Sequence, residues 1–112
     1  MIYAIDFDGT LCEDAYPEIG EPKTKVINLL RELTKMGHKL ILNTCREGEL
    51  LHKAVAWCAS YGLFFDAHNV NLPEVIAKYG GDCKKISADV YVDDRAISPD
   101  DLIKGGIRWD SL

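Results

Sequence analysis

Apolar and polar residues follow two alternating patterns along this chain. Short apolar runs, typical of buried strands, alternate with stretches in which apolar residues recur every three or four positions, as on one face of a helix. The first apolar run starts at Ile2 and ends in the acidic sequence Asp6-Phe7-Asp8-Gly9. The clearest helical stripe ends at Met36 and is followed by Gly37, a residue type that often terminates helices.

These patterns predict an order of elements along the chain. We expect a strand from residue 2 to the acidic sequence, a polar loop (12–21), a helix (22–36), a strand (38–43), a helix (47–61), a short strand (63–65), a short helix (71–79), a strand (88–92), a last helical turn from residue 98 and an edge strand (106–109). Strands that alternate with helices predict a parallel sheet covered by helices on both faces, which is a three-layer, Rossmann-like α/β fold. The length of 112 residues leaves room for one hydrophobic core, so residues 1–112 are expected to form a single domain.

Polar residues stand at the ends of three of the expected strands. Asp6 and Asp8 end the first, Thr44 follows the second, and Asp93-Asp94 follow the fourth. Parallel strands point the same way, so these residues should share the edge of the sheet where open α/β folds bind ligands. Two acids this close require a cation, a shared proton or a phosphorylated ligand. A turn that uses Asp and Gly for local hydrogen bonds is the alternative, but such a turn needs one Asp rather than two.

Composition narrows the classes of function. A net charge of -5 disfavours a nucleic-acid backbone as the main partner and agrees with acids gathered around a metal ion. No apolar run approaches the roughly 18 residues of a membrane span, and no basic region precedes Ile2 as in a signal peptide, so we expect a cytoplasmic protein without a membrane partner. The four cysteines form neither a Cys-x-x-Cys pair nor a zinc pattern, and are expected to be reduced thiols.

The residues at the predicted edge suit the hydrolysis of a phosphate monoester. Asp6 could attack phosphorus to form an aspartyl-phosphate, and Asp8 could protonate the leaving oxygen and later accept a proton from water. Mg²⁺ would neutralise the charge between carboxylate and phosphate, with Asp93 as a second ligand and Asp94 in reserve. Thr44 could donate its hydroxyl to a phosphoryl oxygen.

A lysine and an arginine are further candidates for binding the phosphate. Lys84 and Lys85 lie just before the fourth expected strand, and Lys85 is preferred because it is nearer the strand entry. Either lysine could instead be a solvated loop charge. Arg46 could bind a substrate phosphate or be an ordinary surface charge. Thr44-x-x-Glu47 could also simply cap the second helix.

In order and placement, these motifs resemble the haloacid dehalogenase-like phosphohydrolases. Asp6-Phe7-Asp8-Gly9-Thr10-Leu11 is similar to the first signature of that family, the strand that ends at Thr44 to the second, Lys85 to the third, and Asp93-Asp94 to the acidic fourth. The resemblance implies a Rossmann-like fold, Mg²⁺ dependence and phosphomonoester hydrolysis through Asp6. It also implies that the main-chain carbonyl of Asp8 helps to bind the metal, so that Asp6, Asp8 and Asp93 form the metal site.

The chain departs from the family pattern in its size. No interval is long enough for a cap domain, so the site should be open. An open site suits a bulky phosphorylated substrate, or one that a neighbouring subunit covers in a homo-oligomer. Tyr16, in the polar loop, could line the entrance or be an ordinary exposed residue.

Other functions remain as alternatives or lack their signatures. A phospho-ligand or protein-binding module on the same fold is the main alternative, although binding alone has no need of an acid at position 8. The chain contains no dinucleotide-binding Gly-x-Gly-x-x-Gly and no P-loop. A signalling receiver domain has its acidic pair early and its lysine late, whereas here the acidic pair comes last.

Overall fold

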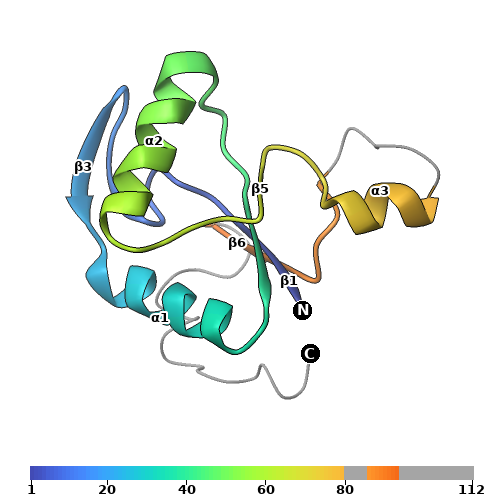
Figure 1. Ribbon diagram of the computed structural model, residues 1–112. Helices are drawn as coiled ribbons and strands as arrows, with labels where there is room; N and C mark the ends of the chain where they lie inside the picture. Colours follow the sequence, from blue (N-terminus) through green and yellow to red (C-terminus); the bar gives the residue numbers. More distant parts are fainter. Residues whose placement is uncertain (80–85, 94–112) are drawn as a thin grey trace.

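A computed structural model describes residues 1–79 and 86–93 of the chain (Figure 1). Its elements, in chain order, are β1 (Ile2–Ile5), β2 (Cys12–Ala15), β3 (Glu18–Pro22), α1 (Thr24–Lys35), β4 (Lys39–Leu42), α2 (Gly48–Ser60), β5 (Ala67–His68), α3 (Pro73–Tyr79) and β6 (Val90–Val92). The last helical turn and the edge strand predicted from residue 98 onward lie outside the described residues, as do Lys84, Lys85 and Asp94.

Four strands form a parallel sheet in the order β5-β4-β1-β6. β1 occupies an inner position, where Ile5 pairs with Leu42 of β4 on one side and with Val92 of β6 on the other. The prediction of an α/β fold with a parallel sheet is therefore confirmed, and the arrangement is compatible with a Rossmann-like fold. Because β1 is paired on both sides, the backbone that leads into Asp6 is fixed by two ladders of hydrogen bonds.

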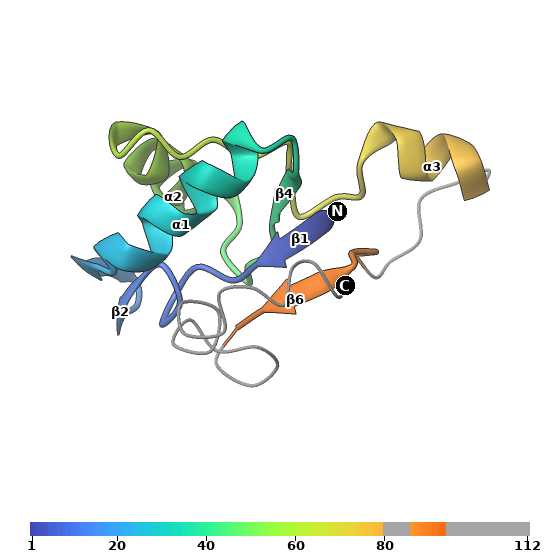
Figure 2. The same cartoon turned by 90° about the horizontal axis from the view of Figure 1, so that it is seen from below.

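Helices α1 and α2 lie on the same side of this sheet (Figure 2). The main core lies between these two helices and the sheet, and it includes alternate residues of the strands, such as Tyr3 and Ile5. A smaller cluster forms on the opposite face around Ile41 and Leu72, with Val75 of α3 packed against it. A complete three-layer arrangement remains a prediction. In the part of the chain that the structure describes, no helix is long and apolar enough to cross a membrane.

The expected polar loop at 12–21 is wrong, because these residues form the antiparallel hairpin of β2 and β3, outside the main sheet. Of the nine strand residues, Cys12 alone is fully buried, so no apolar alternation could reveal the strands. The hairpin depends on Gly20, since a Cβ at that position would overlap the carbonyl oxygen of Glu13. The second strand of the hairpin, β3, ends at Pro22, so α1 begins two residues later than predicted.

The short strand predicted at 63–65 is also wrong. Leu63 is buried in the core that contains α2, whereas Phe64 is 66% exposed. The strand that pairs with β4 is instead β5, which has only two residues. A strand of that length is too short to produce a recognisable pattern.

Two aspartates stabilise the amino ends of the sheet. The carboxylate of Asp66 accepts a hydrogen bond from the backbone N–H of Leu40 at 2.8 Å, and that of Asp89 accepts one from Ile2 at 2.7 Å. Both side chains thus bind the beginnings of neighbouring strands, at the first residue of β1 and the second residue of β4. They lie at the edge opposite the predicted site and are part of the fold.

Candidate functional site

The carboxyl ends of three neighbouring strands bring together the residues that topology predicted. The amide of Asp6 donates to the carbonyl of Val92 at 3.0 Å, and the amide of Asn43 donates to the carbonyl of Ile5 at 2.8 Å. Asp6 therefore lies at the edge of the sheet between Asp93, which follows β6, and Thr44, which follows β4. All three residues are half-buried, so they are held by the fold while still meeting solvent.

The chain turns sharply just after Asp6 and carries Asp8 away from the strand. The carbonyl of Phe7 accepts hydrogen bonds from the amides of Thr10 and Leu11, at 3.1 and 2.9 Å. Gly9 has a φ of +84°, a left-handed conformation that a residue with a side chain adopts only with strain. The two acids of the first motif consequently have different supports: Asp6 continues a paired strand, and Asp8 belongs to a turn.

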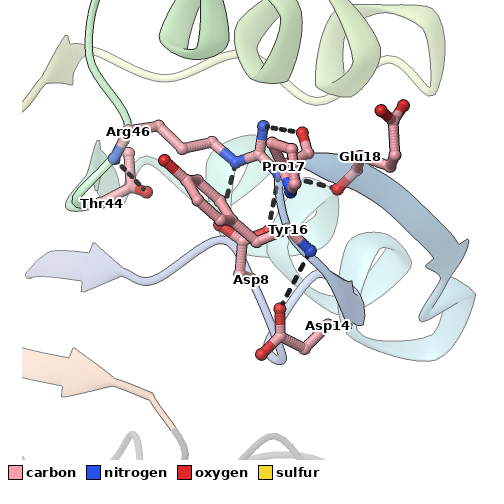
Figure 3. Close-up of polar contacts among 7 residues, drawn as sticks. All are labelled: Asp8, Asp14, Tyr16, Pro17, Glu18, Thr44 and Arg46. Atoms are coloured by element: carbon pink, nitrogen blue, oxygen red, sulfur yellow. Dashed lines mark hydrogen bonds and ion pairs between the residues drawn. The ribbon is translucent and has the colours of Figure 1, made fainter.

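Asp8 forms a bidentate ion pair with Arg46 (Figure 3). Nε of Arg46 donates to Oδ2 of Asp8 at 2.9 Å, and Nη2 donates to Oδ1 at 2.8 Å. The Arg46 side chain is only 1% exposed, and that of Asp8 is 20% exposed. The hydrogen bonds to Asp8 are the main cause that raises the pKa of Arg46 above its ordinary value. Arg46 is thus a buried cation, and its interpretation as an ordinary surface charge is wrong.

The guanidinium of Arg46 also binds the tip of the hairpin. Nη1 donates to the carbonyl oxygen of Pro17 at 3.2 Å, and Nη2 donates to that of Glu18 at 2.9 Å (Figure 3). Four of the five N–H donors of Arg46 are therefore used by Asp8 and these two carbonyls. In this way a single side chain joins the turn after β1 to the turn between β2 and β3.

Two aromatic rings lie against the same guanidinium. Cζ of Arg46 is 5.0 Å from the centre of the Phe7 ring and 5.1 Å from that of Tyr16, distances at which a cation is attracted to an aromatic ring. Phe7 is completely buried and also contacts Trp57 edge to face at 5.5 Å. Tyr16 is 56% exposed, so it covers the buried cation while presenting part of its ring to solvent.

The loop that carries Thr44 and Arg46 is fixed by Asn69. Oδ1 of Asn69 accepts from the amide of Thr44 at 2.8 Å, and Nδ2 donates to the carbonyl of Arg46 at 3.2 Å. Asn69 has a φ of +55°, in a region that asparagine tolerates better than most residues. The sequence pattern did not single out Asn69, because a lone asparagine after a two-residue strand carries no recognisable signal.

Thr44 retains the capacity that its predicted role requires. Its Oγ1 accepts a hydrogen bond from the amide of Arg46 at 3.2 Å, which leaves its hydroxyl hydrogen available as a donor to a ligand. The alternative that Thr44 caps the second helix is wrong. The residue before α2 is Glu47, and no side chain forms a capping hydrogen bond there.

The donor set can be tested against the expected magnesium ion. Among residues 1–79 and 86–93, no group of three His, Cys, Asp or Glu side chains is arranged to hold a metal. Mg²⁺ in phosphate-processing sites commonly takes only one or two carboxylates, together with phosphate oxygens and water. Asp6 and Asp93, which follow adjacent strands, would supply these carboxylates, so the donor types fit a magnesium ion. Because its side chain is bound by Arg46, Asp8 could contribute only through its main chain.

Comparison with solved structures adds one informative relative. A structure described as that of a conserved protein coded by a locus of Bacteroides thetaiotaomicron matches the whole of this chain and 92% of its own chain, with a TM-score of 0.85 and 39% sequence identity. The chain belongs to the same family as that conserved protein. No model of a known protein family matches the chain, and a search of curated proteins gives no significant match.

This family is shown by its fold and sequence, and its function must be inferred from the site. A shared fold by itself does not identify a reaction. The arrangement of Asp6, Asp8, Thr44, Arg46 and Asp93 therefore carries the functional argument.

Proposed function

We propose that this protein is a Mg²⁺-dependent phosphatase of the haloacid dehalogenase-like type, which hydrolyses phosphate monoesters through an aspartyl-phosphate on Asp6. The observation that supports it is the position of Asp6 directly after an inner strand of a parallel sheet, between Asp93 and Thr44. A nucleophile benefits from a fixed backbone because catalysis requires it to be aligned with phosphorus. The neighbouring strands β6 and β4 are followed by Asp93, a second acid, and by Thr44, a hydroxyl donor, at the same edge of the sheet.

Each residue has a distinct part in the proposed reaction. A carboxylate oxygen of Asp6 forms a bond to phosphorus as the bond from phosphorus to the ester oxygen breaks, and Asp8 supplies the proton that the departing alcohol takes up. Water then attacks the aspartyl-phosphate and Asp8 recovers a proton from it, so that phosphate leaves and the carboxylate of Asp6 is regenerated. The hydroxyl of Thr44 orients a phosphoryl oxygen. A bound Mg²⁺ supplies neutralising charge between the Asp6 carboxylate and the phosphate.

The surroundings of the site favour a bulky, non-nucleic-acid substrate. In the described part of the chain, only the short hairpin lies between β1 and α1, where a covering domain could otherwise have been inserted. Acids on that hairpin are exposed and would repel a polyanion: Glu13, Asp14, Glu18 and Glu21. A phosphorylated protein or a large phosphorylated metabolite suits such an open, acidic entrance. A cytoplasmic location belongs to the same proposal, and coverage of the site by a second subunit of a homo-oligomer is the alternative to a bulky substrate.

A phosphate-ester panel with and without Mg²⁺ tests this function. We expect Asp6→Asn to lower the rate by about a thousandfold or more, because the amide cannot act as the nucleophile. Asp66→Asn is the matched control, since it makes the same change at the opposite edge of the sheet and keeps the oxygen that accepts from Leu40. Intact Asp6→Asn protein that still turns over the esters at the wild-type rate would refute the proposal.

One observation favours the second candidate, a module that binds a phosphorylated ligand without hydrolysing it. Both carboxylate oxygens of Asp8 already accept hydrogen bonds from Arg46, so Asp8 has a structural role that explains its presence without catalysis. This candidate predicts that phosphate or a phosphopeptide with Mg²⁺ raises the melting temperature, while no ester in the panel is hydrolysed. Mg²⁺-dependent turnover that Asp6→Asn abolishes would exclude it.

A further inference from the structure

Arg46 connects segments that the sheet does not hold together. It comes from the loop between β4 and α2, and its guanidinium reaches both the turn that contains Asp8 and the tip of the hairpin (Figure 3). Burying a charge has a large desolvation cost, which a partner of opposite charge and good geometry must offset. An apolar side chain could fill the same space without that cost. The buried cation therefore points to a role beyond filling the core.

We propose that Arg46 is a positioning residue, which ties Asp8 to the hairpin so that the two move as one unit relative to Asp6. This inference rests on the proposed function, in which Asp8 transfers protons. Within the described residues, Arg46 is the one donor that binds the Asp8 carboxylate. Without Arg46, the side chain of Asp8 would be held only by the turn at Gly9. Asp6 needs no such support, because its backbone continues a doubly paired strand.

A shared hydrogen-bond donor couples the hairpin to proton transfer. Nη2 of Arg46 donates both to Oδ1 of Asp8, at 2.8 Å, and to the carbonyl of Glu18, at 2.9 Å. A movement of the hairpin tip that carries this nitrogen with it changes the hydrogen bond to Asp8 as well. Each oxygen of Asp8 accepts one hydrogen bond from Arg46 and keeps a second lone pair, so Asp8 can exchange a proton with a leaving alcohol while Arg46 holds it in place. A substrate that displaces the tip would therefore also shift the carboxylate of Asp8.

Lysine cannot reproduce this connection. Arg46 uses the fork of its guanidinium on a carboxylate and further N–H groups on two carbonyls, and its planar group also contacts the rings of Phe7 and Tyr16. A lysine presents a single ammonium group and has no planar face. Arg46→Lys would keep the positive charge and lose the geometry, so it separates an electrostatic role from a positioning role.

The kinetic test compares two esters that depend differently on proton donation. An aryl phosphate with an acidic leaving group departs without help, whereas an alkyl phosphate needs a proton from Asp8. We expect Arg46→Gln to lower kcat about 100-fold for the alkyl ester and by less than about fivefold for the aryl ester, with Arg46→Lys close to Arg46→Gln. Asp8→Asn should show the same selectivity, and the double variant should be no slower than Asp8→Asn alone. Arg31→Gln, at an exposed position of α1, is the control for loss of charge and should match the wild type.

Hydrogen exchange supplies a readout that does not depend on activity. Arg46→Gln should speed exchange of the hairpin amides, residues 13–20, about tenfold or more, while the amides of β1 and β4 remain protected. Asp8→Asn should have a smaller effect in the same direction, and it serves as the second variant if Arg46→Gln does not fold. Unchanged exchange in the hairpin of either variant would overturn the proposed connection.

The outcomes separate this inference from the proposed function. Suppose that Arg46→Gln lowers kcat equally for both esters, and that in the double variant this loss multiplies with the loss caused by Asp8→Asn. Arg46 would then act on the phosphate itself, and the positioning role would be overturned. Wild-type rates in Arg46→Gln would overturn it as well. If the wild-type protein hydrolyses no ester, the proposed function fails, and with it the catalytic half of the inference. The exchange experiment then decides the remaining half, whether Arg46 joins Asp8 to the hairpin.

Discussion

Cys58 is expected to make the protein lose stability in mildly alkaline solution. Its side chain lies in the main core, 1% exposed, and burial raises the pKa of its thiol from an ordinary value of 9.0 to about 12, with a smaller contribution from Cys12. The thiol is neutral in the folded protein and ionises more readily once the chain unfolds. The stabilisation is therefore complete below pH 9 and is lost progressively between pH 9 and about pH 12.

The size of the loss follows from that interval. Each pH unit beyond the pKa of the unfolded thiol removes about 1.4 kcal/mol of unfolding free energy, and the loss at pH 10 is about 1.4 kcal/mol. Urea unfolding between pH 7 and pH 10, with a reductant present, measures it. Cys58→Ala should be less stable at pH 7 by about 1 kcal/mol, because it loses a buried sulfur, but its stability should fall by about 1.4 kcal/mol less than that of the wild type by pH 10.

Cys45, which is exposed, provides the matched control. Cys45→Ala removes a thiol without changing the core and should follow the wild type at every pH. Burial also raises the pKa values of Cys12 and Tyr3, so the Cys58→Ala variant retains a residual slope. The comparison of the two cysteine variants isolates Cys58. If Cys58→Ala and the wild type lose stability in parallel up to pH 10, the reasoning about the buried thiol is wrong.

Two further substitutions test the turn and the hairpin beside the site. Gly20→Ala should lower the unfolding free energy by more than about 2 kcal/mol, because the new Cβ meets the backbone of Glu13. Thermal unfolding would show the loss as a lower melting temperature. A melting temperature unchanged within error would show that the hairpin adapts freely. Thr10→Val should leave the unfolding free energy unchanged or raise it by up to about 1 kcal/mol, because the Thr10 hydroxyl is buried with no partner in the described chain. A loss above about 1 kcal/mol in urea unfolding would mean that the hydroxyl is bonded after all.

The parallel sheet could be predicted because its strands are continuous apolar runs. Tyr3 and Leu40 on one face of the sheet and Ala4 and Ile41 on the other are all buried, and burial on both faces of a sheet produces such runs. The hairpin could not be predicted in this way, because its residues are mostly exposed and acidic. Its strands are specified by main-chain pairing and by one close approach at Gly20. Neither feature leaves a periodic trace in the sequence.

The candidate site likewise has one part that the sequence could predict and another that it could not. The meeting of Asp6, Thr44 and Asp93 at one edge follows from strand direction, which the order of elements already gives. The burial of Arg46 depends on how a loop after β4 folds over a turn after β1, 38 residues earlier in the chain. Sequence alone shows an arginine between Cys45 and Glu47 in a loop, and a surface arginine could have the same neighbours. Tertiary packing therefore determined the partner of Asp8.

The turn between β2 and β3 has a consequence for anyone who modifies this protein. Exposed tips of hairpins are normally the safest places to insert a tag, a linker or a second domain. Here the carbonyl oxygens of Pro17 and Glu18 accept hydrogen bonds from the buried guanidinium of Arg46. The backbone of the tip is therefore fixed, although its side chains face solvent. An insertion at this turn would withdraw two of the groups that solvate Arg46. A tag, linker or second domain should therefore be inserted at another position on the surface.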